Sequence, residues 1–481
     1  MKALDRQVAW DWRLVVPVVL LIVAFDVALG YASTGNPWVV AGLVAALFAI
    51  VLLLSSGTAL FLTVFVAKPF IDMLWFADVH VSGASLNAQS IVSVAVLGVG
   101  LLTIMIRRIE LPNTVFIPMA IFAASNVIAL LMTPSLPYGA ESLIRVVCGL
   151  PLVFVVPTLV KGLPAPRRLL QYYMVAIGVV YVTILLQPLG LLPFGSTDAG
   201  GIQRATGFYY HPWDVARYLV VALPLVLAIM GDRTTTPALR WMYRGLFAAT
   251  LLVTFLTYLK AAWIAVLVEI VLWFFLTRRP LRGALVLAVV AVVVAFPARD
   301  FVFTVFGDLA KLSDPASSGQ ALSGRVSVWS TYWDSLRDAG PFQLLFGQGF
   351  DPAGYEAIGY ATHDDYLRLV VMNGVLGLLA YLTLIAGALR LLARAVRVLR
   401  RRGGIEWRIG VAVQCIVAAY LLMGLTADVS SYSSITLYLW LLIGLVWGYA
   451  RRDTAREARV RTESTGASAR PTGPAVLDAP G

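Results

Sequence analysis

The sequence predicts an all-α, polytopic membrane protein with about 12–14 transmembrane helices. Apolar residues make up 60% of the 481 residues and charged residues only 13%, whereas about 25% charged residues is usual in soluble domains. The mean hydropathy of the whole chain is positive, so the apolar residues are not confined to one anchor. They also form runs of about 20 residues, the length that a helix needs to cross a hydrocarbon layer of about 30 Å.

Apolar runs along the chain give the positions of the predicted helices. In chain order these are 14–30, 38–54, 58–76, 88–106, 114–132, 141–160, 169–189, 212–230, 243–259, 261–277, 283–298, 366–389, 409–427 and 432–450. Few charged residues interrupt these runs. Lys68 and Asp72 lie one helical turn apart, so we expect them to pair.

Clusters of basic residues predict how the helices are oriented. Each cluster follows an even number of predicted spans, so all lie on one side of the membrane together with the basic N-terminus. They cover residues 107–108, 161–168, 233–244, 278–282, 390–408 and 451–461. Positively charged loops stay in the cytoplasm, which predicts that both termini are cytoplasmic.

Two long loops are expected on the opposite, extracytoplasmic side, at about 190–211 and 299–365. The second is large enough to contain short helices, and its aromatic residues favour order, because disordered segments lack them. Within it, Arg325 to Leu336 is expected to form an amphipathic helix. Residues 1–453 are therefore assigned to the membrane domain, and the polar residues 454–481 are predicted to be a disordered cytoplasmic tail.

The formal net charge of +11 does not indicate a nucleic-acid-binding protein, since the basic residues form short clusters between apolar runs. No phosphate-binding glycine loop, nucleotide fingerprint or zinc-ligand spacing is present, so the sequence predicts no metal and no cofactor. Cys148 and Cys415 lie within apolar runs, where small packing residues are expected.

Arginine and histidine residues in the two long loops form the predicted site. Arg204 and Arg325 lie on the side that the positive-inside bias should keep poor in arginine, so each needs a local reason. A guanidinium binds phosphate through a planar fork of donors, and two of them suit a diphosphate. His363 can accept a proton from a hydroxyl near neutral pH. We therefore predict an anionic phosphate substrate beside a general base.

Five further residues are predicted to line the same site: Lys260, Arg145, His211, Asp364 and Arg368. Simpler structural roles remain open for several of them. His211 and Asp364 each lie just before a predicted helix, where capping is a sufficient explanation. Arg145 near a helix end has snorkelling as an alternative.

Three blocks of the sequence resemble the O-antigen polymerase and ligase superfamily over about 190–450. The blocks are Arg204-Ala205-Thr206-Gly207-Phe208 with His211-Pro212, then Gly324-Arg325 with Trp329 and Leu345-Phe346-Gly347-Gln348-Gly349-Phe350, then His363 with Tyr366-Leu367 and Asn373-Gly374-Val375-Leu376-Gly377. The family often has a serine–arginine pair where this chain has Leu259-Lys260. Lys260 keeps the positive charge but lacks the planar set of donors of a guanidinium.

The resemblance implies a metal-independent, inverting glycosyltransferase of the bacterial cytoplasmic membrane. Its donor would be a glycan on undecaprenyl diphosphate, held by Arg204 and Arg325, and His363 would deprotonate the acceptor hydroxyl. The acceptor would be a glycan or a lipid-linked glycan, so polymerase and ligase both stay open. Membrane lipid and other polysaccharide assembly or chain-length proteins are the remaining expected partners.

A transporter or flippase of lipid-linked or anionic substrates is the alternative of a different class. It explains the apolar helices equally well and would depend on charges deep in the bundle, such as Lys68, Asp72 and Glu269. Such proteins commonly show a repeat between their halves, and no clear repeat is present. A scaffold for other assembly enzymes is a third, weaker interpretation.

Overall fold

The structure is a computed structural model, and it describes residues 57–73, 79–81, 84–86, 88–107, 109, 111–192, 196–197, 203–232, 234–295, 307, 310–311, 324–350 and 362–468. Helices dominate these residues, as predicted, and two short antiparallel hairpins, β1–β2 and β3–β4, accompany them. The predicted helices at 14–30 and 38–54 lie outside the described residues.

The other twelve predicted spans all coincide with helical segments. The elements are α3 (Gly57–Leu62), η2 (Thr63–Ala67, a π-helical turn), α4 (Lys68–Met73), β1 (Val79–Val81), β2 (Ala84–Leu86), α5 (Ala88–Arg107), α6 (Asn113–Met132), α7 (Leu136–Val147), α8 (Leu152–Leu159), α9 (Pro166–Leu185), β3 (Ser196–Thr197), β4 (Gln203–Arg204), α10 (Pro212–Met230), α11 (Pro237–Leu256), α12 (Lys260–Leu276), α13 (Pro280–Ala295), α15 (Arg325–Asp338), α16 (Pro341–Phe346), α18 (Asp365–Arg402), α19 (Gly404–Met423), η5 (Val429–Ser431, a 3₁₀ turn) and α20 (Ser433–Ser468).

Six of the described helices are long and apolar enough to cross a membrane, or seven if the bent pair α7–α8 is one span. The predicted span 141–160 is this pair, bent by 44°, because Pro151 follows the break and cannot donate a backbone hydrogen bond. The figure of 12–14 transmembrane helices for the whole chain stays a prediction.

The bundle has a buried centre and an apolar outside. In the most apolar stretch of α20, 94% of the residues are buried, against 22% in α6. Helix α18 packs on α6, α20 packs on α8, and α19 packs on both α10 and α12. Large apolar side chains exposed on the outer helices, such as Leu131, Phe275 and Leu281, mark the surface where lipid would lie.

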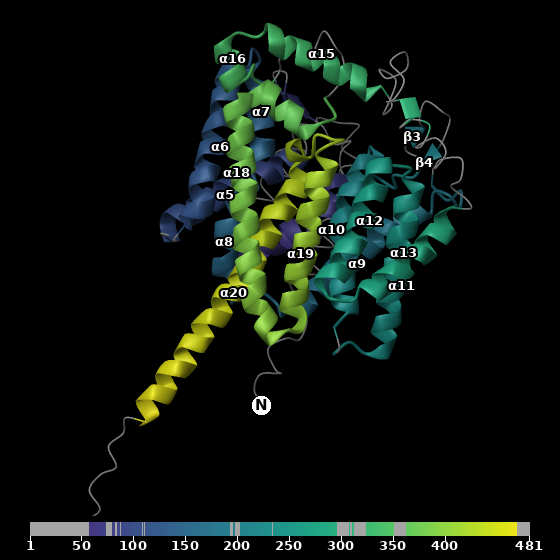
Figure 1. Cartoon of the computed structure of the whole chain (residues 1–481), viewed down its shortest axis with the longest axis vertical. Coiled ribbons are helices and arrows are strands. Elements are labelled where there is room, and N and C mark those ends of the chain that lie inside the picture. The colour runs from purple at the N-terminus through teal and green to yellow at the C-terminus, as the bar shows by residue number, and fades with distance from the viewer. Residues whose placement is uncertain are drawn as a thin grey trace, which may run out of the picture.

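The bundle has two chemically different ends. The hairpin β3–β4 and the helices α15 and α16, which belong to the two long loops, lie at the same end, here called the loop end (Figure 1). The turn between α18 and α19 lies at the opposite, basic end, where Arg402 pairs with Asp453 at 3.0 Å and Arg452 with Glu406 at 3.2 Å.

The predicted tail is wrong for residues 454–468, because α20 continues through them to Ser468. The segment begins with alanine, arginine and glutamate residues, which are strong helix formers. Glu457 also pairs with Arg402 of α18 at 3.3 Å. Residues 469–481 lie outside the described residues.

The expected helix in the second long loop is confirmed as α15 (Arg325–Asp338). Tyr332 and Leu336 are its two buried side chains, and they pack on Leu367, Val370 and Val371 of α18. This contact fixes the helix across the start of α18, and so places Arg325 at the loop end.

Candidate active site

The loop that carries Arg204 is fixed at three points. The side-chain Oε1 of Gln187 accepts hydrogen bonds from the backbone N–H groups of Thr206 and Gly207, at 2.8 and 2.9 Å. The Tyr209 hydroxyl donates to the Pro69 carbonyl oxygen at 2.8 Å. The backbone N–H of Ala205 donates to the carbonyl oxygen of Leu256, at the end of α11, at 3.0 Å. Arg204 is half-buried, and the last contact brings its loop beside the turn that leads to Lys260.

His211 caps α10, the simpler of its two predicted roles. Its Nδ1 accepts a hydrogen bond from the Trp213 N–H at 3.2 Å, and its own N–H donates to Asp214 at 3.1 Å. Asp214 also accepts from Arg217 at 2.7 Å. This capping contact uses Nδ1 and does not involve Nε2 of the imidazole.

His363 lies immediately before α18 in a left-handed backbone conformation, with φ of 48°. Its neighbour Thr362 is held twice: the hydroxyl donates to Asp428 at 2.7 Å, and the carbonyl accepts from the Trp329 indole at 2.9 Å. On the other side, Asp364 caps α18 by accepting from the Leu367 N–H at 2.8 Å. Neighbours on both sides therefore fix the backbone at His363.

The predicted cationic residues at the loop end act on one another electrostatically. Burial lowers the pKa of His363, Arg325 lowers it further, and Asp428 raises it. Burial also lowers the pKa of His211; nearby Asp214 raises it, and the positive charges of Arg217, Arg204 and His363 lower it. We call Arg204, His211, Arg325 and His363 the outer cluster.

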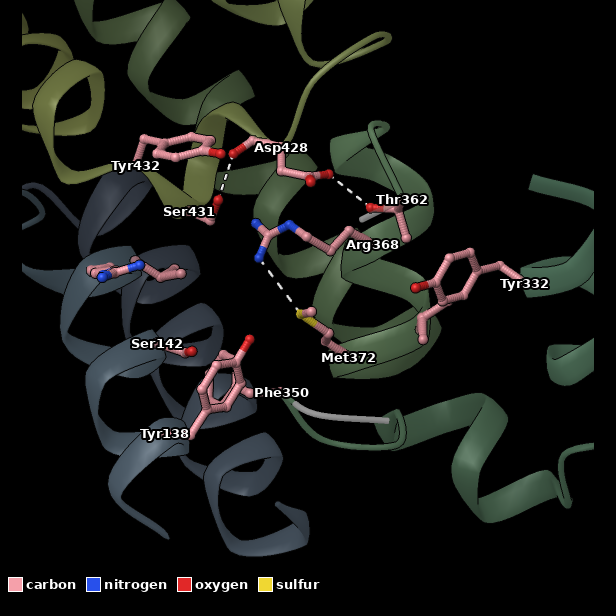
Figure 2. Close-up of a pocket in the computed structure, with 13 residues that line it drawn as sticks. Tyr138, Ser142, Tyr332, Phe350, Thr362, Arg368, Met372, Asp428, Ser431 and Tyr432 are labelled. Atoms are coloured by element: carbon pink, nitrogen blue, oxygen red, sulfur yellow. Dashed lines mark hydrogen bonds between the residues drawn. The ribbon is translucent and has the colours of Figure 1, made fainter. Parts of the chain in front are cut away.

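Arg145 and Arg368, also predicted, lie at a separate cavity of about 160 Å³ beside the outer cluster. Figure 2 shows Tyr138 and Ser142 of α7 on one side of the cavity and Arg368 and Met372 of α18 on the other. The segment between α19 and α20 closes it with Asp428, Ser431 and Tyr432.

Both arginines of this cavity have carboxylate partners. Arg145 pairs with Glu141 one turn earlier on α7. Arg368 pairs with Asp365 at 2.9 Å, and Asp365 also accepts from the Ser430 hydroxyl at 2.7 Å. The second network ties the start of α18 to the loop before α20.

Asp428 is the main residue of the site that the sequence reasoning missed. It lines the cavity, bonds to Thr362 and acts electrostatically on both His363 and Arg325. The signal was present, because Asp428 lies in the turn between the predicted spans 409–427 and 432–450, on the same face as His363. A carboxylate in a short turn is too common to be singled out without a structure.

The transporter alternative depends on three charged residues that lie inside the bundle, Lys68, Asp72 and Glu269. Lys68 and Asp72 are buried and paired, as predicted, and the Tyr218 hydroxyl donates to Asp72. Glu269 is fully buried in α12, and neither carboxylate oxygen has a hydrogen-bond partner among the described residues. Among the described residues no three His, Cys, Asp or Glu side chains lie close enough together to hold a metal ion.

Comparison with known proteins gives one family match. Residues 245–382 match the model of the family described as O-Antigen ligase. The segment contains Lys260, Arg325, His363, Asp364 and Arg368. It leaves out Arg145, Arg204, His211 and Asp428, which lie before or after it in the chain. A search of curated proteins finds no match.

The match confirms the predicted relationship to the O-antigen polymerase and ligase superfamily. Together with the apolar helices, it indicates an integral membrane protein with a role in surface polysaccharide assembly. The family implies lipid-linked glycan substrates and a glycosyltransferase-like enzyme.

Proposed function

We propose that this protein transfers glycan from undecaprenyl diphosphate to a hydroxyl of an acceptor glycan on the extracytoplasmic face of the bacterial cytoplasmic membrane. The observation that carries the proposal is the outer cluster. Its histidine and arginine side chains come from two loops far apart in the sequence and act on one another at the same end of the bundle.

Arg204 and Arg325 hold the diphosphate in this mechanism. The bond between the anomeric carbon and the diphosphate oxygen breaks as transfer proceeds, and negative charge grows on the departing diphosphate. Guanidinium groups beside that oxygen stabilise the transition state more than the ground state, which is the requirement for catalysis. Lys260, at the turn beside the Arg204 loop, adds a further positive charge.

His363 is the general base. Burial and Arg325 hold its pKa below the usual range, so the imidazole is neutral near pH 7 and can accept the proton of the acceptor hydroxyl. The oxygen then attacks the anomeric carbon from the side opposite the diphosphate. Direct displacement inverts the configuration at that carbon, and no metal ion takes part in the scheme.

Reconstitution tests this function directly. Purified protein in liposomes is given a radiolabelled undecaprenyl-diphosphate-linked glycan with its acceptor, and the products are sized while released undecaprenyl diphosphate is measured. We expect labelled glycan on the acceptor with one released diphosphate per bond formed, and no product with Arg325→Ala at equal insertion. Full product formation by that variant contradicts the assignment.

The same liposomes test the transporter alternative. It is favoured by the buried Glu269 carboxyl, which has no hydrogen-bond partner in the described part of the chain. Transport predicts that the labelled lipid-linked glycan becomes accessible on the opposite leaflet with its glycan–diphosphate bond intact. It also predicts that Glu269→Gln abolishes activity. Transfer predicts new glycosidic bonds, and predicts that Glu269→Gln keeps them.

A further inference from the structure

The cavity beside the outer cluster has the size of one six-membered ring. Its volume is about 160 Å³, and a cavity of about 150 Å³ in another protein holds one benzene molecule. The space is far too small for a whole lipid-linked repeat, so at most one sugar ring can enter it.

The lining of the cavity is polar in a way that suits hydroxyl groups. Hydroxyls of Ser142, Thr362 and Ser431 and the carboxylate of Asp428 lie around it, together with the rings of Tyr138 and Tyr432 (Figure 2). Specific pockets combine apolar or aromatic walls with a few placed polar groups that fix orientation. A sugar ring has both an apolar face and a rim of hydroxyls, so it matches this lining.

The charges of the cavity argue against a second diphosphate there. Arg145 and Arg368 are its cationic side chains, and each is paired with a carboxylate of its own helix, Glu141 and Asp365 respectively. Asp428 adds another negative charge. A diphosphate would have to displace these carboxylates or lie against Asp428, since like charges repel at short range. Neutral hydroxyls can bond to the paired groups as they stand.

We propose that this cavity binds the terminal sugar ring of the acceptor glycan, and that Asp428, Arg368 and Arg145 are hydrogen-bonding residues for sugar hydroxyls. The assignment rests on the proposed transfer reaction, because that reaction defines which sugar is the acceptor.

The position of His363 favours the acceptor as the ligand of the cavity. His363 follows Thr362, which lines the cavity and donates to Asp428 at 2.7 Å, so a hydroxyl held there is near the proposed base. A direct displacement needs the attacking hydroxyl and the departing diphosphate on opposite sides of the anomeric carbon. Arg204 and Arg325 do not line the cavity, so a diphosphate held by them leaves the cavity to the acceptor.

Each atom of the step is then accounted for. The acceptor hydroxyl gives its proton to the imidazole of His363 and forms the new bond to the anomeric carbon. The bond from that carbon to the diphosphate oxygen breaks, and its electron pair stays on the diphosphate, beside the arginines.

Two ligands and a pair of matched tryptophan variants test the assignment. A panel of methyl hexopyranosides and methyl N-acetylhexosaminides serves as the sugar probe, observed by saturation-transfer NMR with the full-length protein in nanodiscs. Undecaprenyl diphosphate serves as the second probe. Ser142→Trp fills the cavity, and Ser330→Trp adds the same side chain on the exposed face of α15.

We expect at least one glycoside to bind to the wild type and to Ser330→Trp, and its affinity to fall about tenfold or more in Ser142→Trp. Undecaprenyl diphosphate should bind both variants like the wild type, and should weaken in Arg204→Ala. If Ser142→Trp lowers the unfolding temperature, Tyr138→Ala, which removes a wall of the cavity, provides the same comparison.

Three results would decide against the proposal or against its premise. Glycosides that do not bind, or that bind Ser142→Trp unchanged, overturn the sugar assignment. Loss of undecaprenyl diphosphate binding in Ser142→Trp instead places the diphosphate in the cavity, and also overturns it. Unchanged diphosphate binding in Arg204→Ala and Arg325→Ala, with glycoside binding still blocked by Ser142→Trp, refutes the proposed function but leaves a sugar-binding cavity.

Discussion

His363 adopts a backbone conformation that is uncommon for residues other than glycine, with φ of 48°. Such conformations persist where the surroundings determine them, and they occur frequently at functional sites. Here Thr362 is held through both its hydroxyl and its carbonyl, and Asp364 caps the next helix. Contacts of both neighbours therefore fix the backbone at His363.

Asp428 should control the pH at which His363 works. The negative charge of Asp428 raises the pKa of His363, whereas burial and Arg325 lower it. Activity requires the neutral imidazole, so it falls as the pH drops through the pKa of His363, which lies below the usual value of about 6.5. Removing the charge with Asp428→Asn lowers this pKa further.

A pH–rate profile in liposomes checks this prediction. The acidic limb should move to lower pH in Asp428→Asn, whatever happens to the maximal rate. Asp334→Asn, on the exposed part of α15 where Asp334 pairs with Arg337, is the matched control and should leave the limb in place. An acidic limb that stays, or that moves to higher pH, excludes Asp428 as the charged neighbour of the base.

The sequence singles out Arg204 and Arg325 because they carry positive charge on the side of the membrane where arginine is unexpected. His211 and His363 precede predicted helices in the same two loops, and the structure brings these loops to one end of the bundle (Figure 1). Arg145 and Arg368 lie at the adjoining cavity instead of in the outer cluster. Their carboxylate partners are on the same helices, but the cavity is formed by five separate segments. No pattern within one segment predicts it.

At the scale of single elements, two glycine motifs fit into each other. Helix α18 is kinked at Gly374, where φ is 70°, and the loop after α16 passes the kink at Gly347, where φ is 87°. A Cβ on Gly374 would lie 2.1 Å from the Leu345 carbonyl oxygen, and one on Gly347 would lie 2.1 Å from that of Met372. The N–H of Gln348 donates to Val371 at 2.8 Å. Both positions therefore require glycine.

Gly374→Ala should be strongly destabilising. A side chain at this position meets backbone and adopts a strained φ, and costs of about 1–3 kcal/mol are typical for the strain alone. Gly178→Ala in α9 is the matched control, because its Cβ meets nothing within 4 Å and alanine is the better helix former by about 1 kcal/mol. Thermal unfolding in detergent should show a lower midpoint for the first variant and an equal or higher midpoint for the second.

The opposite ranking of the two midpoints contradicts the packing described for α16 and α18. A loss of activity in Gly374→Ala is also expected, since α16 leads from α15 and Arg325 to the kink. That loss alone decides nothing, because a destabilised protein is inactive for many reasons.

The helices themselves were predictable because each apolar run is long and bounded by charged or turn-forming residues. The span 212–230 coincides with α10 (Pro212–Met230), and His211 and Pro212 supply its start. The interruption between α7 and α8 was not predicted, since apolar residues continue through it. Composition alone does not predict the helix at residues 454–468. The ion pair between Glu457 and Arg402 of α18 supports this helix, and that contact is not visible in the sequence.

On the scale of the whole molecule, the two ends of the bundle divide the chemistry. The loop end carries the outer cluster and the cavity, and the basic end carries ion pairs such as Arg402–Asp453. The positive-inside rule predicts that the basic end is cytoplasmic, and the proposed site would then face the extracytoplasmic side. The sequence makes the same prediction, because every basic cluster follows an even number of predicted spans.

Cysteine labelling tests the orientation in intact cells. Ser330→Cys on α15 should react with a membrane-impermeant maleimide, whereas Thr462→Cys on the exposed part of α20 should react only after lysis. The native Cys148 and Cys415 are buried, so the background should be low. Labelling of Thr462→Cys in intact cells would reverse the orientation and move the site to the cytoplasm.

In the proposed mechanism one imidazole, that of His363, takes the proton of the acceptor hydroxyl beside a diphosphate held by arginines. The rate of glycan transfer by His363→Asn in liposomes tests this role. Asparagine tolerates the left-handed backbone at this position but does not titrate near neutral pH, so the fold is kept and the base is lost. We expect correct insertion, an unchanged unfolding midpoint, wild-type binding of undecaprenyl diphosphate, and a rate lower by about 10²–10⁴-fold. A rate close to that of the wild type would contradict the account.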